Sequence, residues 1–397
     1  MRGNRIPAGP RRPARPAGPA GRRARVERID TAPLVTPVVG PTDQPIQAAD
    51  AAEVGAPRLA RHLITLSDGH QVGVAICGRG VPLVLVHGFS AEGILYAQTL
   101  SRLVSMGFKV VAIVQAGHGG TLGLPTGGAT MADYAELLGR VVDELGIRRA
   151  VFMGHSMGGR LVTELVAAEP ERAIGVILLD AIVGDTWDRM VNLFRFTPPL
   201  LAGIGGLLAV DTLTTVPVFR DPRQAVKLGR LIAPTIAGHV RRPWRLIAPA
   251  VSILRSGGTA DMLDQLGAAR VPLFVIHGDC DLAVPIATAK AASRRGDGDL
   301  VVIHRASHSW LLKDPEALPG VMLELMKGRL GTARLRAVMV GGVDPVDATP
   351  EEVESVFFEP DALVSLLTPT EPWDDREDMH QQPRYRWTIK PQLRRAG

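Results

Sequence analysis

The sequence predicts an α/β fold, in which a mostly parallel β-sheet is flanked by helices and carries an inserted all-helical cap. Short runs of exclusively apolar residues, typical of strands buried on both faces, alternate with amphipathic helical segments and predict the sheet. The stretch between Leu179 and Pro272 shows helical patterns but no strand pattern, which predicts the cap. A length of 397 residues with 46% hydrophobic content fits one large globular domain with appendages.

The strands are predicted in chain order from these apolar runs. An antiparallel hairpin comes first, with strands at 63–66 and 72–76 around Asp68-Gly69, a dipeptide typical of tight turns. The runs that follow lie at 82–86, 110–114, 150–153, 176–179, 272–276 and 301–303. Helical spacing marks 132–145 and 315–326 in the core and 187–196, 221–236 and 243–255 in the cap.

Composition divides the chain into five segments. Residues 1–57 are rich in Arg, Pro, Ala and Gly without sustained periodicity, and we expect them to be disordered. Residues 58–183 and 271–330 form the two parts of the α/β core, and residues 184–270 form the helical cap. Residues 331–397 hold twelve acidic and eight basic residues, which we interpret as a charged tail. Within this tail Thr349-Pro350, with Glu352, predicts the start of a short helix that ends near Phe358.

The charge distribution argues against a nucleic-acid partner. Residues 1–30 hold nine arginines against Glu27 and Asp30, a charge of +7, so the rest of the chain carries −2 of the net +5. The arginine-rich segment is either an unstructured extension, from a start codon placed too far upstream, or a weak tether to an anionic membrane surface. No apolar segment supports a signal peptide or a transmembrane span, so we expect a cytoplasmic protein, peripheral to the membrane at most.

The two cysteines, Cys77 and Cys280, provide neither a disulfide framework nor a CxxC metal signature. We expect both to be inert thiols, with Cys280 a small buried side chain.

The pentapeptide Gly154-His155-Ser156-Met157-Gly158 lies between the apolar run 150–153 and a helix-like segment from 160. A sharp strand-to-helix turn exposes a serine hydroxyl and directs the first helical N–H groups at a reacting oxygen. The glycines let the chain pass through this bend without Cβ clashes. Ser156 is therefore the predicted nucleophile of an acyl transfer; the alternative is an ordinary helix N-cap.

A serine nucleophile needs a base, an acid and an oxyanion hole. His308 follows the last strand and is the predicted base, and Asp281 follows the preceding strand and is the predicted acid. Catalytic groups of open α/β sheets gather beyond the carboxyl ends of the strands, where these residues lie. The backbone N–H groups of Met157 and Phe89 are the predicted oxyanion hole. Asp180 or Asp185, after the earlier strand, stays open as an alternative acid.

These motifs resemble those of the α/β-hydrolase superfamily, in its serine hydrolase and esterase branch with a helical cap. The resemblance covers residues 61–330, and the order Ser156, Asp281, His308 along the chain is the one that this superfamily implies. Two positions depart from the family pattern: Gln115 occurs where an aspartate is frequent before Gly117-His118-Gly119, and Ser307 precedes His308 where many relatives have glycine. The matching residues are His87-Gly88-Phe89, Gly117-His118-Gly119, Gly154 to Gly159, Gly278 to Asp281 with Val284-Pro285, and Ser307-His308.

Serine at the turn, rather than aspartate, predicts attack on an acyl carbon and argues against dehalogenase or epoxide hydrolase chemistry. Apolar residues concentrated at 190–210 favour a small lipophilic ester as substrate. We therefore predict a carboxylic-ester hydrolase, lipase-like, that needs no cofactor and no metal. A thioesterase, C–C hydrolase, acyltransferase or cofactor-free peroxidase remains an alternative, as does a catalytically silent ligand-binding or membrane-peripheral protein. The natural ester and the oligomeric state stay open.

Overall fold

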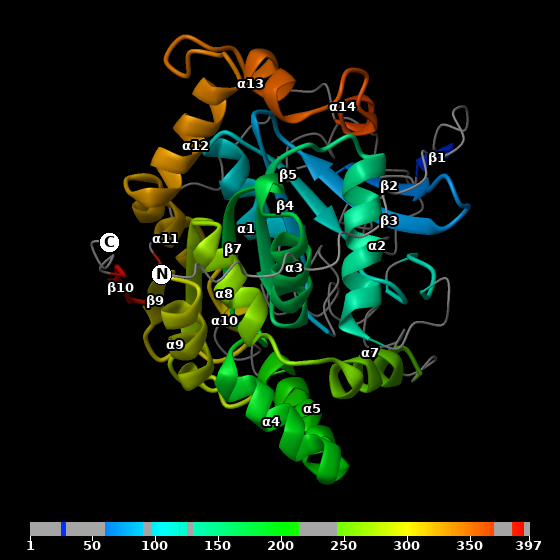
Figure 1. Ribbon diagram of the computed structural model, residues 1–397, viewed down its shortest axis with the longest axis vertical. Coiled ribbons are helices and arrows are strands. Elements are labelled where there is room, and N and C mark those ends of the chain that lie inside the picture. The colour runs from blue at the N-terminus through cyan, green and yellow to red at the C-terminus, as the bar shows by residue number, and fades with distance from the viewer. Residues whose placement is uncertain are drawn as a thin grey trace, which may run out of the picture.

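The computed structural model describes residues 25–28, 60–89, 97–118, 120–124, 130–213, 244–368 and 383–392. Ten strands form one sheet: β1 (Arg25–Arg28), β2 (Ala60–Thr65), β3 (Gln71–Cys77), β4 (Val81–Val86), β5 (Phe108–Ile113), β6 (Ala150–His155), β7 (Ala173–Leu179), β8 (Leu273–Gly278), β9 (Asp299–Ile303) and β10 (Trp387–Lys390). Their order is β1-β2-β3-β5-β4-β6-β7-β8-β9-β10 (Figure 1). Neighbours from β5 to β9 run parallel, and the strands outside them pair antiparallel. The predicted fold class is confirmed.

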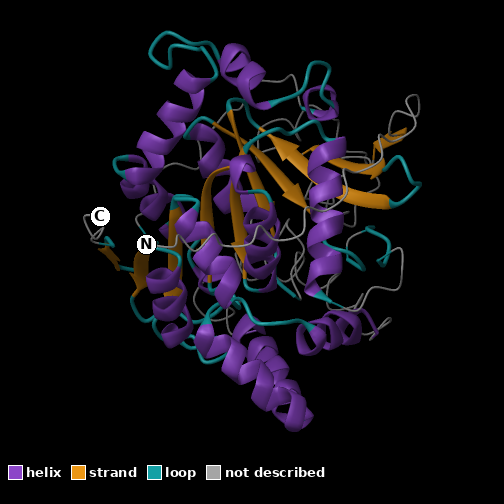
Figure 2. Cartoon of the chain, in the orientation of Figure 1, coloured by secondary structure: helices purple, strands orange, loops and turns teal. Residues whose placement is uncertain are grey.

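Helices cover both faces of this sheet (Figure 2). The helices of the core are α1 (Ala97–Ser105), α2 (Met131–Glu144), α3 (Met157–Ala168), the short 3-10 helix η3 (Pro170–Arg172), α9 (Ile286–Arg295), α10 (Trp310–Lys313), α11 (Ala317–Met326) and α12 (Arg329–Val340). In β4, Val84 and Val86 join the apolar cluster beneath α2 and α3, while Leu83 and Leu85 join the cluster beneath α1 and α11. Side chains alternate between faces along a strand, so burial on both faces requires an exclusively apolar run.

The segment between β7 and β8 is helical wherever it is described. It contains α4 (Asp185–Phe196), α5 (Pro198–Leu213), α7 (Trp244–Arg255) and α8 (Ala260–Ala268). Helices α4 and α7 confirm the predicted helices at 187–196 and 243–255, and the one predicted at 221–236 lies outside the described residues. In Figure 1 α4 and α5 project beyond one end of the strands, whereas α8 packs against α3 and α9 of the core.

The N-terminal segment differs from the predicted disorder at four residues. Residues 25–28 form β1, which pairs antiparallel with β2 from Arg25↔Thr65 to Arg28↔His62. An open strand edge offers unpaired backbone N–H and C=O groups, so even a polar segment can pair with it. The other residues of 1–57 lie outside the described part of the chain, where disorder and a membrane tether stay predictions.

The C-terminal segment 331–397 is not simply the charged tail that was predicted. Besides α12, it forms α13 (Pro350–Phe357) and α14 (Leu363–Leu367), and β10 pairs antiparallel with β9. The capping box of Thr349 and Glu352 confirms the predicted helix start, and α13 ends at Phe357 as expected. The segment docks because apolar side chains lie at buried positions among its charges: Ala337, Val338, Phe357, Phe358, Val364 and Leu367.

A buried ion pair fastens α13 to the sheet. Lys109 of β5 is fully buried, and its Nζ lies 2.8 Å from Glu354 Oε2 and 4.8 Å from the Phe358 ring centroid. Glu354 Oε1 also accepts a hydrogen bond from Gly80 N at 3.0 Å. Burial lowers the pKa of Lys109, and Glu354 opposes this effect by stabilising the ammonium. The C-terminal segment thus neutralises a charge inside the core.

Glu354→Ala is expected to lower the free energy of unfolding by about 3–5 kcal/mol, because it leaves Lys109 as an unpaired buried charge. Glu351→Ala is the matched control, since Glu351 lies on the same helix but forms an exposed ion pair with Arg79 at 3.2 Å. The control is expected to cost less than about 1 kcal/mol. Urea unfolding of both variants measures the difference. Equal losses would show that the buried Lys109–Glu354 pair contributes no more to stability than the exposed pair of Glu351.

Among the described helices, none has both the length and the apolarity that crossing a bilayer requires.

Candidate active site

Ser156 lies in a strained turn between β6 and α3. Its φ of 52° and ψ of −116° fall in a region that non-glycine residues rarely adopt, at a cost of roughly 1–3 kcal/mol. The turn is fixed on both sides: Ser156 N donates to Leu179 O at 2.8 Å, and Ser156 O accepts from Gly159 N at 3.1 Å. The predicted strand, turn and helix around Ser156 are therefore present.

The glycines around Ser156 answer specific steric demands. A Cβ on Gly154 would lie 2.4 Å from Gly158 O, and a Cβ on Gly158 would lie 2.2 Å from Val86 O. A Cβ on Gly159 would lie 2.4 Å from the Cβ of Ala181. All three separations are below any normal contact, so the turn can pack between β4 and β7 only with glycine at these positions.

The loop after β4 approaches the same turn. A Cβ on Gly88 would lie 3.2 Å from Ser156 Cβ, which brings the predicted oxyanion donor Phe89 into the neighbourhood of Ser156. His118 Nε2 donates to Phe89 O at 2.8 Å and fixes the peptide that follows Phe89. Met157 is the first residue of α3, where a backbone N–H has no partner within the helix. Both predicted donors are therefore close to Ser156 in the structure.

Gln115, at the position where an aspartate was expected from the resemblance, holds the base of the predicted oxyanion loop. Its backbone N donates to His87 Nε2 at 3.0 Å, and its side-chain amide donates to His87 O. His87 Nδ1 in turn donates to Gly88 O at 2.7 Å. Burial lowers the pKa of His87 to about 3, so the ring is neutral and fixed in this tautomer. His87 and His118 thus shape the loop.

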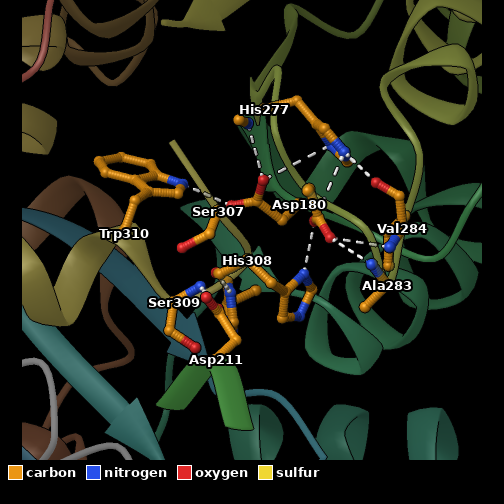
Figure 3. A network of polar contacts seen from close by, with 12 residues as sticks. Asp180, Asp211, His277, Ala283, Val284, Ser307, His308, Ser309 and Trp310 are labelled. Carbon is orange, nitrogen blue, oxygen red and sulfur yellow. Dashed lines mark hydrogen bonds and ion pairs between the residues drawn. The ribbon is translucent and has the colours of Figure 1, made fainter. Parts of the chain in front are cut away.

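His308 and Asp281 are joined by a short hydrogen bond. His308 Nδ1 donates to Asp281 Oδ2 at 2.6 Å, while Asp281 Oδ1 accepts from Ala283 N at 2.9 Å and Val284 N at 2.8 Å (Figure 3). Burial alone would raise the pKa of Asp281, but the charge and hydrogen bond of His308 and the other donors hold this pKa below its usual value. The carboxylate is therefore ionised and orients the imidazole.

The His308 ring lies beside the serine turn. Its centroid is 4.9 Å from that of His155, the residue that precedes Ser156, and His155 Nε2 donates to His308 O at 3.3 Å. Burial alone would lower the pKa of His308, but Asp281 above all, and also Asp180 and Asp211, raise this pKa to about 9. Residues separated by more than a hundred positions in the sequence are thus brought together at the carboxyl end of the sheet.

Asp180, the alternative acid, has other partners. Its Oδ1 accepts from Gly278 N at 2.9 Å, and its Oδ2 accepts from Trp310 Nε1 at 2.6 Å (Figure 3). Burial raises the pKa of Asp180 to about 6. Asp185, the other alternative, begins α4 and forms an ion pair with Arg295 at 3.2 Å. Of the three candidate acids, Asp281 is the one hydrogen-bonded to His308.

A family comparison decides the class. The family described as "Serine aminopeptidase, S33" matches residues 81–316, which is more than half of the chain and includes all of the site residues above. The chain belongs to this family of α/β-hydrolases.

Individual relatives agree with this class. A protein named as a non-heme haloperoxidase in Mycobacterium phage D29 is 31% identical over 260 residues, 64% of this chain and 90% of that one. A monoacylglycerol lipase of Mycolicibacterium smegmatis is 24% identical over 216 residues, 53% of this chain and 74% of that one. Among solved structures, a thermophilic esterase of Thermogutta terrifontis has a TM-score of 0.51 at 25% identity, covering 67% of this chain and 98% of that one.

In the hydrolase, the buried side chain of His277 lies between the carboxylates of Asp180 and Asp281. His277 directly precedes the Gly278-Asp279-Cys280-Asp281 motif, but no sequence pattern predicted a role for it. Its Nε2 donates to Val284 O at 2.7 Å, and its Nδ1 is 3.7 Å from Asp180 Oδ1 (Figure 3). Asp180, His277 and Asp281 are close enough to bind one cation, yet all four carboxylate oxygens already accept hydrogen bonds from the protein. A hydrogen-bond network accounts for this cluster, and independence from metal stays a prediction.

Cys280 of the hydrolase is exposed, and its predicted burial was wrong. It lies in the turn after β8 between Asp279 and Asp281, and because Asp281 points inward its neighbour points to solvent. Asp279 accepts from Arg305 N at 2.6 Å and pairs with His304 at 3.1 Å, as expected for a turn residue. His304 Nε2 also bonds Thr388 Oγ1 at 2.7 Å, which links it to β10.

Trp310→Phe is expected to lower the free energy of unfolding by about 1–3 kcal/mol, because Asp180 Oδ2 loses its buried N–H donor and the smaller ring leaves a gap in the core. Trp187→Phe is the control, since the Trp187 ring packs edge-on against Phe194 in α4, away from any carboxylate contact shown here. Urea unfolding of single variants and of the Asp180→Asn double variant gives the coupling between Trp310 and Asp180. Additive losses in that cycle would contradict a stabilising hydrogen bond.

Proposed function

We propose that the protein is a serine hydrolase of carboxylic esters with a lipophilic acyl group, acting through Ser156, His308 and Asp281. The observation that carries the proposal is the 2.6 Å hydrogen bond between His308 and Asp281 next to the strained turn of Ser156. A buried imidazole held in one tautomer by an ionised carboxylate is the arrangement that a serine base requires. Relatives named for ester hydrolysis, the mycobacterial lipase and a pimeloyl-[acyl-carrier protein] methyl ester esterase of Yersinia enterocolitica, support the reaction class.

The proposed reaction has two halves. His308 Nε2 takes the proton of Ser156 Oγ while Oγ attacks the acyl carbon, and the resulting oxyanion binds the N–H groups of Phe89 and Met157. The C–O bond to the alcohol then breaks, His308 returns the proton to the leaving oxygen, and an acyl-enzyme remains. Water deprotonated by His308 attacks this ester, the bond to Ser156 Oγ breaks, His308 returns the proton to Oγ, and the carboxylic acid leaves. Asp281 stabilises the imidazolium in both halves.

The insertion between β7 and β8 supports a lipophilic substrate, and we propose that residues 184–270 form a cap over the site. Val191 and Phe194 of α4 pack inward, but other apolar side chains of α4 and α5 remain in solvent, with Phe196 86% and Val210 59% exposed. Exposed apolar surface of this kind is typical of sites that receive apolar ligands. Its exposed members are Leu193, Phe196, Leu200, Leu207 and Val210.

A cofactor-free peroxidase reaction is the second candidate. The phage protein named as a haloperoxidase is 31% identical to this chain, and further relatives in Rhodococcus erythropolis and Streptomyces lividans carry haloperoxidase and chloroperoxidase names. The same serine and base would serve this reaction, so the site geometry does not separate the two. Parallel assays of ester hydrolysis and of peroxide-dependent bromination discriminate between them.

Ser156→Ala is expected to abolish labelling by a fluorophosphonate probe and to reduce kcat on p-nitrophenyl esters by about 10⁴–10⁶-fold. A series of acyl chain lengths is expected to show an optimum longer than acetate. Ser365→Ala, an exposed serine of α14, is the control and should label like the wild type. A folded wild-type protein that does not label would instead favour a ligand-binding protein.

The pH dependence follows from the raised pKa of His308. Only the neutral imidazole can accept the Ser156 proton, and His308 is mostly protonated below its pKa of about 9. We therefore expect kcat/KM to rise close to tenfold per pH unit through the neutral range and to level off near pH 9. Measurement over pH 5–10 with a neutral ester tests this. A plateau that begins near pH 6.5 would contradict the charge network.

A further inference from the structure

A carboxylate from the insertion holds the loop that carries His308. Asp211, near the end of α5, accepts from Ser309 N at 2.7 Å through Oδ2, and its Oδ1 lies 3.4 Å from Lys313 Nζ (Figure 3). Lys313 Nζ also donates to Ser307 Oγ at 2.9 Å, and Thr212 Oγ1 lies 3.2 Å from Ser309 Oγ. Both neighbours of His308 in the sequence are thus connected to α5.

These contacts hold His308 from the side of the insertion, while Asp281 holds it from the core. The Ser309 N–H that Asp211 binds belongs to the peptide directly after His308, so its position sets the direction in which the imidazole leaves the backbone. Charge-assisted hydrogen bonds of this length are stronger and more directional than neutral ones. A shift of α5 would therefore move the backbone of His308 directly.

Asp211 also contributes charge. Burial alone would raise the pKa of Asp211, but the hydrogen bonds from Ser307 and Ser309 and the charge of Lys313 hold this pKa below its usual value, so the group is ionised at neutral pH. It is one of three carboxylates that raise the pKa of His308, after Asp281 and Asp180. The charged and titratable groups that act on His308 directly are Asp281, Asp180, Asp211 and His155. Two further groups act through these carboxylates: His277 lies 3.6 Å from Asp281, and Lys313 lies 3.4 Å from Asp211.

We propose that Asp211 is a positioning residue through which the insertion controls the catalytic base. With α5 on the loop, Asp211 orients His308 and stabilises its imidazolium. With α5 displaced, both effects are lost. A ligand that prefers one of these two positions of α5 therefore also favours the matching state of His308. By linkage, the coupling free energy is the same in both directions. This inference rests on the proposed role of His308 as the base. It adds Asp211 of the insertion to Asp281 of the core as a group that holds His308 in position.

Two substitutions separate orientation from charge. Asp211→Asn keeps an acceptor for Ser309 N but removes the charge, so the midpoint of the pH profile of fluorophosphonate labelling is expected to fall by roughly 0.5–1 pH unit. Asp211→Ala removes both, so the midpoint is expected to fall as in Asp211→Asn and the labelling rate on the high-pH plateau to drop by roughly 10–100-fold. Partial rescue of the rate by Asn relative to Ala is the signature of a positioning role.

Asp188→Asn is the matched control. Asp188 lies in α4 of the same insertion and accepts from Thr259 N at 2.7 Å, far in sequence from the His308 loop. Its loss is expected to lower thermal stability without moving the midpoint of the labelling profile. If Asp211→Asn keeps the wild-type midpoint and Asp211→Ala the wild-type rate, the proposal is wrong.

A histidine NMR titration keeps this test independent of chemistry. The pKa of His308, assigned by comparison with His308→Gln, is expected to be lower in Asp211→Asn than in the wild type, whether or not the protein hydrolyses esters. A lower pKa of His308 in Asp211→Asn, with no labelling of the wild type, would contradict the proposed hydrolase activity but support the coupling between Asp211 and His308. An unchanged pKa with normal labelling would overturn the coupling and leave the hydrolase intact.

Discussion

The active-site end of the sheet depends on one buried carboxylate. Asp180 lies directly after β7 with a φ of 44° and binds the backbone of Gly278 at the end of β8 and the indole of Trp310 after β9. Three strand ends are therefore tied together by a single side chain. Asp281 comes three residues after Gly278, and His308 comes two residues before Trp310. By holding Gly278 and Trp310, Asp180 therefore also positions the 2.6 Å contact between Asp281 and His308. Burying such a group costs free energy unless every oxygen is satisfied, which the N–H donors of Gly278 and Trp310 achieve.

Backbone strain and buried charge are concentrated where these strands end. Both cost free energy, which the packing of the parallel sheet offsets. Ser156 and Asp180 both adopt positive φ, and both lie at carboxyl ends of adjacent strands, where Ser156 N bonds Leu179 O. The fully apolar strands behind them provide the packing that keeps these two turns in place. The same low-polarity surroundings lower the pKa values of His87 and His155 and strengthen the interaction of His308 with Asp281, whose charge raises the pKa of His308.

What the sequence predicted depends on how locally each feature is encoded. The central strands were predictable because burial on both faces demands an uninterrupted apolar run, and the Ser156 turn because three glycines meet backbone or Cβ atoms at 2.2–2.4 Å. The docking of α13 and the grip of Asp211 on Ser309 were not predictable. Lys109 and Glu354, or Asp211 and Ser309, carry no local pattern, and their pairing is set by the tertiary fold across a long stretch of chain. The prediction that Cys280 is buried was wrong for a simpler reason, since a single residue in a turn can face either the core or solvent.

The insertion has an exposed apolar surface but contacts the His308 loop through polar groups, and this combination affects how firmly α5 is held. Helix α5 has no polar side chain from Pro198 to Val210, yet several of its side chains are exposed, so apolar burial does not fix its position fully. Its described attachment to the His308 loop is polar, through Asp211 and Thr212. Contacts of this kind contribute about 0.5–3 kcal/mol each. An element held by a few such contacts can open without unfolding the sheet. In the proposed mechanism, α5 therefore lies against the loop of the proposed base His308, so a change in the position of this helix would change the position of the base.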